Sequence, residues 1–193
     1  MVEDYSEQVL TTCIPTGQCP TCKKPHNELG EFNPNEVSEL RDLSNILGAL
    51  YFFNDNPGDF LKTCKEAGIK PVIDPFRKEL PYANIYWLIT PNILHQLYQG
   101  VLKHLVEWVK QSCGVVEVGQ EHDQISRILL GLVIDCPQPG GLSNVRLVRA
   151  VRALLDFVFL AQYPIHTNET LILLNDALER FHDNKNIFID LGI

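Results

Sequence analysis

The sequence has no long hydrophobic run, and no apolar stretch approaches the roughly 20 residues that a transmembrane helix needs. It also lacks a signal peptide, because the N-terminus, MVEDYSEQV, is acidic and has no basic segment followed by an apolar one. Internal repeats and low-complexity tracts are missing as well. These absences exclude a helical membrane protein and a repeat protein, and they predict a soluble intracellular protein.

Positive charge is scarce. The 193 residues carry 16 Lys and Arg against 24 Asp and Glu, which gives a formal net charge of −8. A protein that binds nucleic acid by itself neutralises phosphates with clustered basic side chains. Only Arg146, Arg149 and Arg152 come close together, and their spacing does not place all three on one tight helix face. The composition therefore argues against a stand-alone nucleic-acid-binding protein.

Six cysteines are present, and no export signal accompanies them. Free thiols or metal ligands are therefore expected rather than disulfides. Cys19 and Cys22 form a CxxC motif on a turn, where two thiolates can take two corners of a tetrahedral zinc site. Cys13 and His26 are the nearby candidates for the remaining ligands, and there is no second CxxC.

Two other interpretations of the CxxC motif stay open. The two cysteines can be structural free thiols, or they can be a redox-active dithiol. A redox CxxC normally opens a helix after a strand. The segment Lys23-Lys24-Pro25 indicates a loop instead, which argues against the redox interpretation.

The remaining pattern is mostly helical. The best-marked helix covers residues 91–112, with Thr90 as N-cap, Pro91 at the first helical position and apolar side chains recurring every three or four residues: Ile93, Leu94, Leu97, Val101, Leu105, Trp108 and Val109. Further helices are expected over residues 36–53, 59–67, 121–135 and 142–162 and after an N-cap at Thr167. Residues 4–13 predict a short strand, and residues 187–193 predict a loop or strand.

These elements predict a mainly α fold in two parts. Residues 1–34 would form a strand and a CxxC knuckle, and residues 35–193 a helical domain built around helix 91–112.

Four long strings, occurring in a fixed order, resemble the Plavaka-type transposases of fungal genomes, which are distant relatives of the CACTA-like elements. They are DYSEQVLTTCIPTGQCPTCKKPHNELG, DPFRKELPYANIYWLITPNILHQLYQGVLKHLVEW, EHDQISRILLGLVID and LVRAVRALLDFVFLAQYPIHTNETLILLNDALERFHDNKNIFIDLGI. The resemblance covers nearly the whole chain. It implies an RNase H-like catalytic domain interrupted by a largely helical insertion and a zinc-binding CxxC. DNA would be the partner and the nucleus the location.

The resemblance also assigns catalytic positions. Asp4 matches the second of three acidic residues, and Glu121 matches the third, on the helix after the insertion. Together with a first acidic residue they would hold Mg²⁺ or Mn²⁺ for cutting and joining DNA. That first residue is expected upstream of Asp4, where this chain begins.

The remaining matches show further departures. Cys19 and Cys22 match the zinc cysteines. His95 matches the histidine of a D-x-x-H motif, but Asn92 stands where the family has aspartate. The segment between residues 114 and 121 is shorter than in the family. A truncated and internally deleted transposase fragment without DNA cleavage activity is therefore expected.

Two alternatives come from other functional classes. One is a domesticated helical module that binds proteins, and the other is a small zinc-stabilised structural protein. If upstream strands normally cover the predicted strand near Val9, its bare edge predicts self-association.

Overall fold

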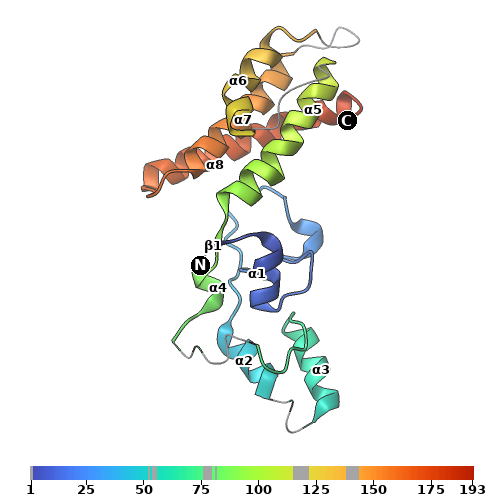
Figure 1. Ribbon diagram of the computed structural model, residues 1–193, viewed down its shortest axis with the longest axis vertical. Helices are drawn as coiled ribbons and strands as arrows, with labels where there is room; N and C mark the ends of the chain where they lie inside the picture. Colours follow the sequence, from blue (N-terminus) through green and yellow to red (C-terminus); the bar gives the residue numbers. More distant parts are fainter. Residues whose placement is uncertain are drawn as a thin grey trace. The chain divides into compact units, whose positions relative to one another are not determined.

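The structure, a computed structural model, describes all residues except 1, 52, 54–55, 76–79, 81, 115–121 and 138–143. The described chain is mainly helical, which confirms the predicted fold class, and it forms two compact units, Met1–Asn92 and Ile93–Ile193 (Figure 1). The predicted domain division after residue 34 stays a prediction. Among the described residues, no helix is long and apolar enough to cross a membrane.

The first unit, Met1–Asn92, contains short elements joined by long connections. Its helices are α1 (Tyr5–Thr12), the 3₁₀ turn η1 (His26–Glu28), α2 (Leu43–Tyr51), α3 (Pro57–Glu66) and α4 (Ile85–Leu88). Two short strands, β1 (Val2–Glu3) and β2 (Thr90–Pro91), pair in parallel, with Val2 opposite Thr90. This pairing brings the two ends of the unit together.

The predicted strand over residues 4–13 is wrong, because this segment forms helix α1. Asp4 and Glu7 build a capping box, in which each side chain accepts a hydrogen bond from the other residue's backbone N–H. The hydroxyl of Thr11 donates to the carbonyl oxygen of Glu7 at 3.0 Å, so this β-branched side chain is accommodated on the helix. Val9 is buried in α1, and the bare strand edge from which self-association was predicted does not exist.

The predicted helix over residues 36–53 is shortened at its start. Asp42 caps α2, because its carboxylate accepts a hydrogen bond from the backbone N–H of Ser44 at 2.8 Å. Upstream of Asp42 the chain is extended and pairs with the CxxC turn, where Cys22 and Leu40 form an antiparallel bridge. Val37, predicted to lie on the apolar helix face, is 95% exposed.

The core of the first unit is built from side chains that are far apart in the sequence. Its buried side chains come from the end of α1, from α2, α3 and α4 and from the segments that follow α3 and α4: Ile14, Ile46, Ala49, Leu50, Phe60, Cys64, Ile69, Ile85, Tyr86 and Ile89. The Tyr86 hydroxyl donates to the carbonyl oxygen of Thr12 at 3.3 Å, which ties α4 to α1. The predicted helix over residues 59–67 is confirmed as α3.

The second unit, Ile93–Ile193, is a helical bundle. A π-helical stretch, η3 (Ile93–Leu102), continues into α5 (Lys103–Cys113), and α6 (His122–Ile134), α7 (Val145–Ala161), α8 (Asn168–Asn184) and α9 (Asn186–Asp190) follow. Helices α7 and α8 pack along each other over much of their length (Figure 1). Thr167 caps α8, as the sequence predicts.

The central helix predicted over residues 91–112 is present over residues 93–113. Its start is different, because Thr90 and Pro91 lie in β2. Its end is as predicted, with Gly114 in the left-handed region at φ 64°. Its buried face includes Leu105 and Val109 from the predicted stripe.

The core of the second unit draws on five helices. Its fully buried side chains include Leu102, Leu105, Val133, Leu147, Ala150, Val151 and Val158. Ile187 and Phe188 belong to the same core, and the Phe188 ring lies 4.9 Å from the Trp108 ring between centroids. The predicted loop or strand is therefore wrong for residues 187–190, because burial of these side chains stabilises the short helix α9, but the loop is confirmed for residues 191–193.

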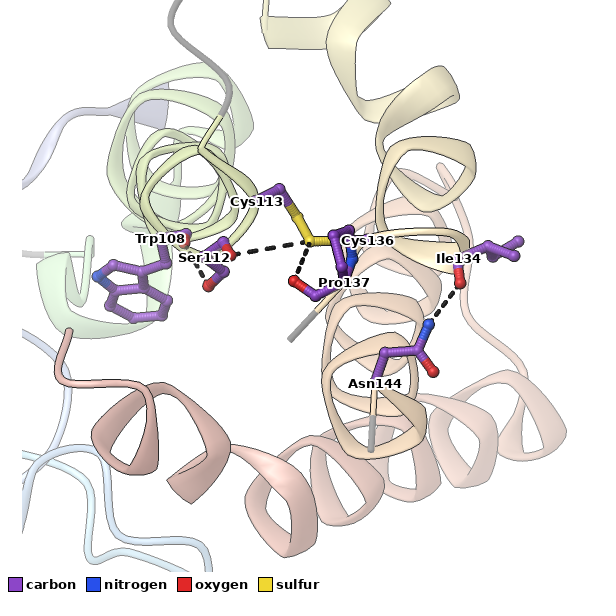
Figure 2. Close-up of a disulfide and its surroundings, with 7 residues drawn as sticks. All are labelled: Trp108, Ser112, Cys113, Ile134, Cys136, Pro137 and Asn144. Carbon is purple, nitrogen blue, oxygen red and sulfur yellow. Dashed lines mark hydrogen bonds between the residues drawn. A yellow bond between two sulfur atoms is a disulfide. The ribbon is translucent and has the colours of Figure 1, made fainter. Parts of the chain in front are cut away.

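A disulfide joins Cys113 at the end of α5 to Cys136 just after α6 (Figure 2). The prediction of free thiols or metal ligands is wrong for these two cysteines. It holds for Cys13, Cys19, Cys22 and Cys64, which are free thiols. Sequence spacing alone does not show that the ends of two helices meet.

Candidate functional site

The CxxC turn lies on the surface of the first unit and is held by backbone pairing. The N–H of Lys23 donates to the carbonyl oxygen of Glu39 at 2.9 Å, and the N–H of Arg41 donates to that of Thr21 at 3.0 Å. Residues 39–41 therefore pair with one side of the turn through their backbone. We call residues 19–23 together with residues 39–41 the CxxC knuckle.

Arg41 is the buried side chain that fixes the knuckle to the rest of the unit. Only 5% of this residue is exposed. Its guanidinium donates to the carbonyl oxygens of Cys19 at 3.0 Å and Gly68 at 3.4 Å and to the side-chain oxygen of Gln18 at 3.2 Å. One rigid fork thus joins the CxxC turn to the end of α3 through neutral acceptors.

The two thiols of the knuckle lie together but have different environments. The backbone N–H of Cys22 donates to Cys19 Sγ at 3.4 Å, and the Thr21 hydroxyl lies 3.3 Å from the same sulfur. Burial raises the pKa of Cys19, but hydrogen bonds from Thr21 and Cys22 outweigh this and lower it below its usual value. Burial and the neighbouring Cys19 raise the pKa of Cys22. Cys19 is therefore the sulfur more readily deprotonated.

The other two zinc candidates do not join this pair. The Cys13 thiol is directed to the carbonyl oxygen of Leu10 at 3.7 Å. His26 Nδ1 hydrogen-bonds to the carbonyl oxygen of Gly17, which indicates that this nitrogen carries the proton. Within the described parts of the chain, no three His, Cys, Asp or Glu side chains form a group that could hold a metal ion.

A pocket of about 490 Å³ adjoins the knuckle. It is lined by the knuckle, by the start of α2 and by the end of α3, including Lys23, Arg41, Asp42 and Glu66. Charges of both signs therefore line it, and its composition does not select an anion or a cation.

Asp4, the candidate second acidic residue, acts as a helix cap. Its carboxylate accepts a hydrogen bond from the Glu7 N–H at 2.8 Å, and the Glu7 carboxylate accepts one from the Asp4 N–H at 3.0 Å. These contacts satisfy two of the N–H groups that have no partner within the helix. They give this aspartate a structural role.

Replacing Asp4 tests this role with a matched pair. We expect Asp4→Ala to lower the free energy of unfolding of the first unit by about 1 kcal/mol, because the cap is lost. Asp4→Asn should stay within about 0.5 kcal/mol, because asparagine caps as well as aspartate but lacks the charge. Urea denaturation of both variants measures the difference. An equal loss in both would show that the charge matters, not the cap.

Of the remaining candidates, only Asn92 is placed near Asp4 among the described residues, because Glu3 pairs with Pro91 and the next residue of each segment lies at the same end of the parallel pair. Glu121 lies outside the described residues. His95 lies in η3, and Asn92 ends the first unit. The catalytic assignments of Asp4 and Glu121 stay predictions.

The family model described as Plavaka transposase matches residues 1–109. The match covers more than half of the 193 residues. The chain belongs to the Plavaka transposase family. The matched segment includes the CxxC knuckle, Asp4, Asn92 and His95, and it ends within the central helix of the second unit. No curated protein and no solved structure matches the chain.

Arg41 is the residue that the sequence did not single out. It falls in a segment predicted to be helical, where an arginine is normally a solvated surface residue. Its position directly before Asp42 was the available signal, because an aspartate that caps α2 places Arg41 outside the helix. A helix that begins at residue 43 leaves residue 41 in the extended segment, where it can pair with the CxxC turn.

Proposed function

We propose that this transposase-derived chain is a degraded part of a fungal, RNase H-like catalytic region and does not cut DNA by itself. An intact member of the family would use three carboxylates to hold divalent metals for DNA cutting and strand transfer. Here the observation that carries the proposal is the capping box of Asp4, since its carboxylate is already hydrogen-bonded to the start of α1. The substitution at Asn92 supports the same conclusion.

The charge distribution supports weak DNA binding at most. The formal net charge is −8. Two arginines of α7 and α8 are paired with carboxylates: Arg146 contacts Asp190 at 2.7 Å, and Arg180 contacts Asp156 at 3.1 Å and Asp176 at 2.9 Å. These pairs leave less positive charge for phosphate groups. DNA and a nuclear location therefore remain the partner and compartment proposed from the family.

Zinc is proposed for the knuckle, with Cys19 and Cys22 as its ligands. Two adjacent sulfurs, one with a lowered pKa, suit the preference of zinc for thiolates. They supply two of the four ligands of a tetrahedral site, and the described residues do not complete it. We therefore expect weak binding by half a site, and the alternative of a zinc-stabilised structural protein is disfavoured.

A nicking assay tests the proposal directly. The purified chain is incubated with labelled supercoiled and linear DNA and with Mg²⁺ or Mn²⁺, and zinc is quantified in the same sample. We expect no cleavage above the rate without protein and well under one zinc per chain. Metal-dependent cleavage that is lost in Glu121→Ala, but kept in the exposed α5 variant Glu107→Ala, would overturn the proposal.

If cleavage does not occur, the helical interaction module remains as the second candidate. Exposed apolar side chains favour it, since Ile165 is 78% and Ile172 is 65% exposed near the turn between α7 and α8. Self-association stays an untested prediction, although the strand edge from which it was predicted is absent, and it can be measured by sedimentation of the same sample.

A further inference from the structure

The Cys113–Cys136 bridge lies outside the CxxC knuckle and beyond the residues that the family model matches. It joins the last residue of α5 to the segment after α6, with the two Cα atoms 5.5 Å apart and a sequence separation of 23 (Figure 2). Glu121 lies between the two cysteines in the sequence. The bridge therefore closes the segment that carries the third candidate acidic residue.

The surroundings of Cys136 suit a thiol as well as a disulfide. This residue is 5% exposed, and its sulfur lies 3.8 Å from the carbonyl oxygen of Ser112 and 3.9 Å from that of Pro137. A bridged sulfur carries no proton to donate. On reduction the two sulfurs move apart, and these carbonyl oxygens are acceptors for the proton of the Cys136 thiol. The site therefore offers partners to the reduced cysteine as well as to the bridge.

The end of α6 is also tied to the start of α7 by a contact that does not depend on sulfur. The Asn144 side-chain amide donates to the carbonyl oxygen of Ile134, the last residue of α6 (Figure 2). Helices α5, α6 and α7 also share the core of the second unit. Loss of the bridge should therefore loosen the helix ends and leave the bundle folded.

The compartment decides which state is present. If the chain is nuclear, as the proposed function has it, it meets a thiol pool that keeps cysteines reduced. In such a compartment, disulfides are usually transient and redox-sensing. Cys113, only partly buried, gives access to the bridge.

We propose that Cys113 and Cys136 form a reversible thiol–disulfide switch that locks the end of α5 to the end of α6. A low-molecular-weight disulfide of the glutathione type is the oxidant. The thiolate of one cysteine attacks a sulfur of this disulfide, forming a mixed disulfide and releasing one thiol. The second cysteine then attacks the protein-bound sulfur, forming the bridge and releasing the second thiol. Two cysteines are oxidised, one small disulfide is reduced to two thiols, and excess thiol reverses both steps.

Oxidation has a defined physical effect. The bridge restricts the unfolded chain by closing a loop between residues 113 and 136, so the oxidised second unit is the more stable form. We expect its midpoint of thermal unfolding to be about 10–20 °C higher than that of the reduced form.

The test uses the full 193-residue chain in glutathione buffers of graded reduced-to-oxidised ratio. Free thiols are trapped by alkylation, and mass spectrometry of peptides counts them at each cysteine. We expect the Cys113–Cys136 pair to change from mostly reduced to mostly bridged between ratios typical of a reducing compartment and of an oxidising one. The unfolding midpoint, followed by circular dichroism, should rise in step with the bridged fraction.

The control is Cys113→Ser with Cys136→Ser, whose unfolding midpoint should match that of the reduced chain and not respond to the ratio. If this variant does not fold, the wild-type titration still decides. A pair that stays bridged at every ratio would be a structural disulfide and would overturn the proposal, as would a pair that never bridges. DNA is absent from these measurements, so their outcome is independent of the nicking assay.

Discussion

Replacing Leu105 with alanine is expected to lower the free energy of unfolding of the second unit by about 3–4 kcal/mol. Leu105 lies on α5 with no exposed surface, within the core that five helices share. Truncation removes buried apolar surface and leaves a cavity that rigid neighbouring helices cannot fill. The effect follows from the position of this helix in the bundle.

The measurement can report on the second unit alone. The chain has two tryptophans, and Trp108 lies in the core-facing part of α5, while Trp87 lies in the first unit and is 69% exposed. A Trp87→Phe background therefore leaves Trp108 as the reporter of denaturant unfolding. Ile128→Ala is the control, because Ile128 is 58% exposed on α6 and should change the free energy by no more than about 0.5 kcal/mol. Equal small effects of both substitutions would contradict the described core.

The second large effect is expected for Arg41→Met, which should destabilise the first unit by about 2–3 kcal/mol. Methionine fills a similar volume but cannot donate, so the carbonyl oxygens of Cys19 and Gly68 and the amide of Gln18 lose their donor. Relief of the buried charge offsets part of this loss, because burial alone disfavours the guanidinium and lowers its pKa.

Amide hydrogen exchange should show where stability is lost. Protection should fall at Lys23 and Arg41, whose N–H groups pair the two sides of the knuckle. Arg41→Lys keeps the charge but not the planar fork, and we expect it to recover less than half of the loss. Arg149→Met, at an exposed position of α7, is the control. A neutral or stabilising Arg41→Met would show that the knuckle is held without this side chain.

Much of the helical architecture could be predicted from the sequence. The 3.6-residue periodicity identified α5, α6 and α7, and Thr167 correctly marked the start of α8. Local signals sufficed here because these helices bury one continuous face. The prediction from β-propensity failed for α1. There the capping box of Asp4 and Glu7, which is also a local contact, stabilises a helix instead.

The candidate site was harder to predict because its contacts are non-local. Nothing near Cys19 in the sequence indicates that residues 39–41 pair with the CxxC turn or that Arg41 is buried behind it. The meeting of Cys113 and Cys136 likewise depends on how α5 and α6 pack. The family match supplied the origin of the chain, which neither composition nor packing shows.

Binding of Mn²⁺ tests most directly the central claim that this transposase-derived chain has no working carboxylate metal site. The purified chain, Asp4→Asn and Glu121→Gln are titrated with Mn²⁺ under identical conditions, and bound metal is followed by electron paramagnetic resonance. We predict no binding in the micromolar range for any of the three, since Asp4 caps α1. A micromolar site in the wild-type chain that is lost in both variants would show that Asp4 and Glu121 hold metal together, and it would contradict the account.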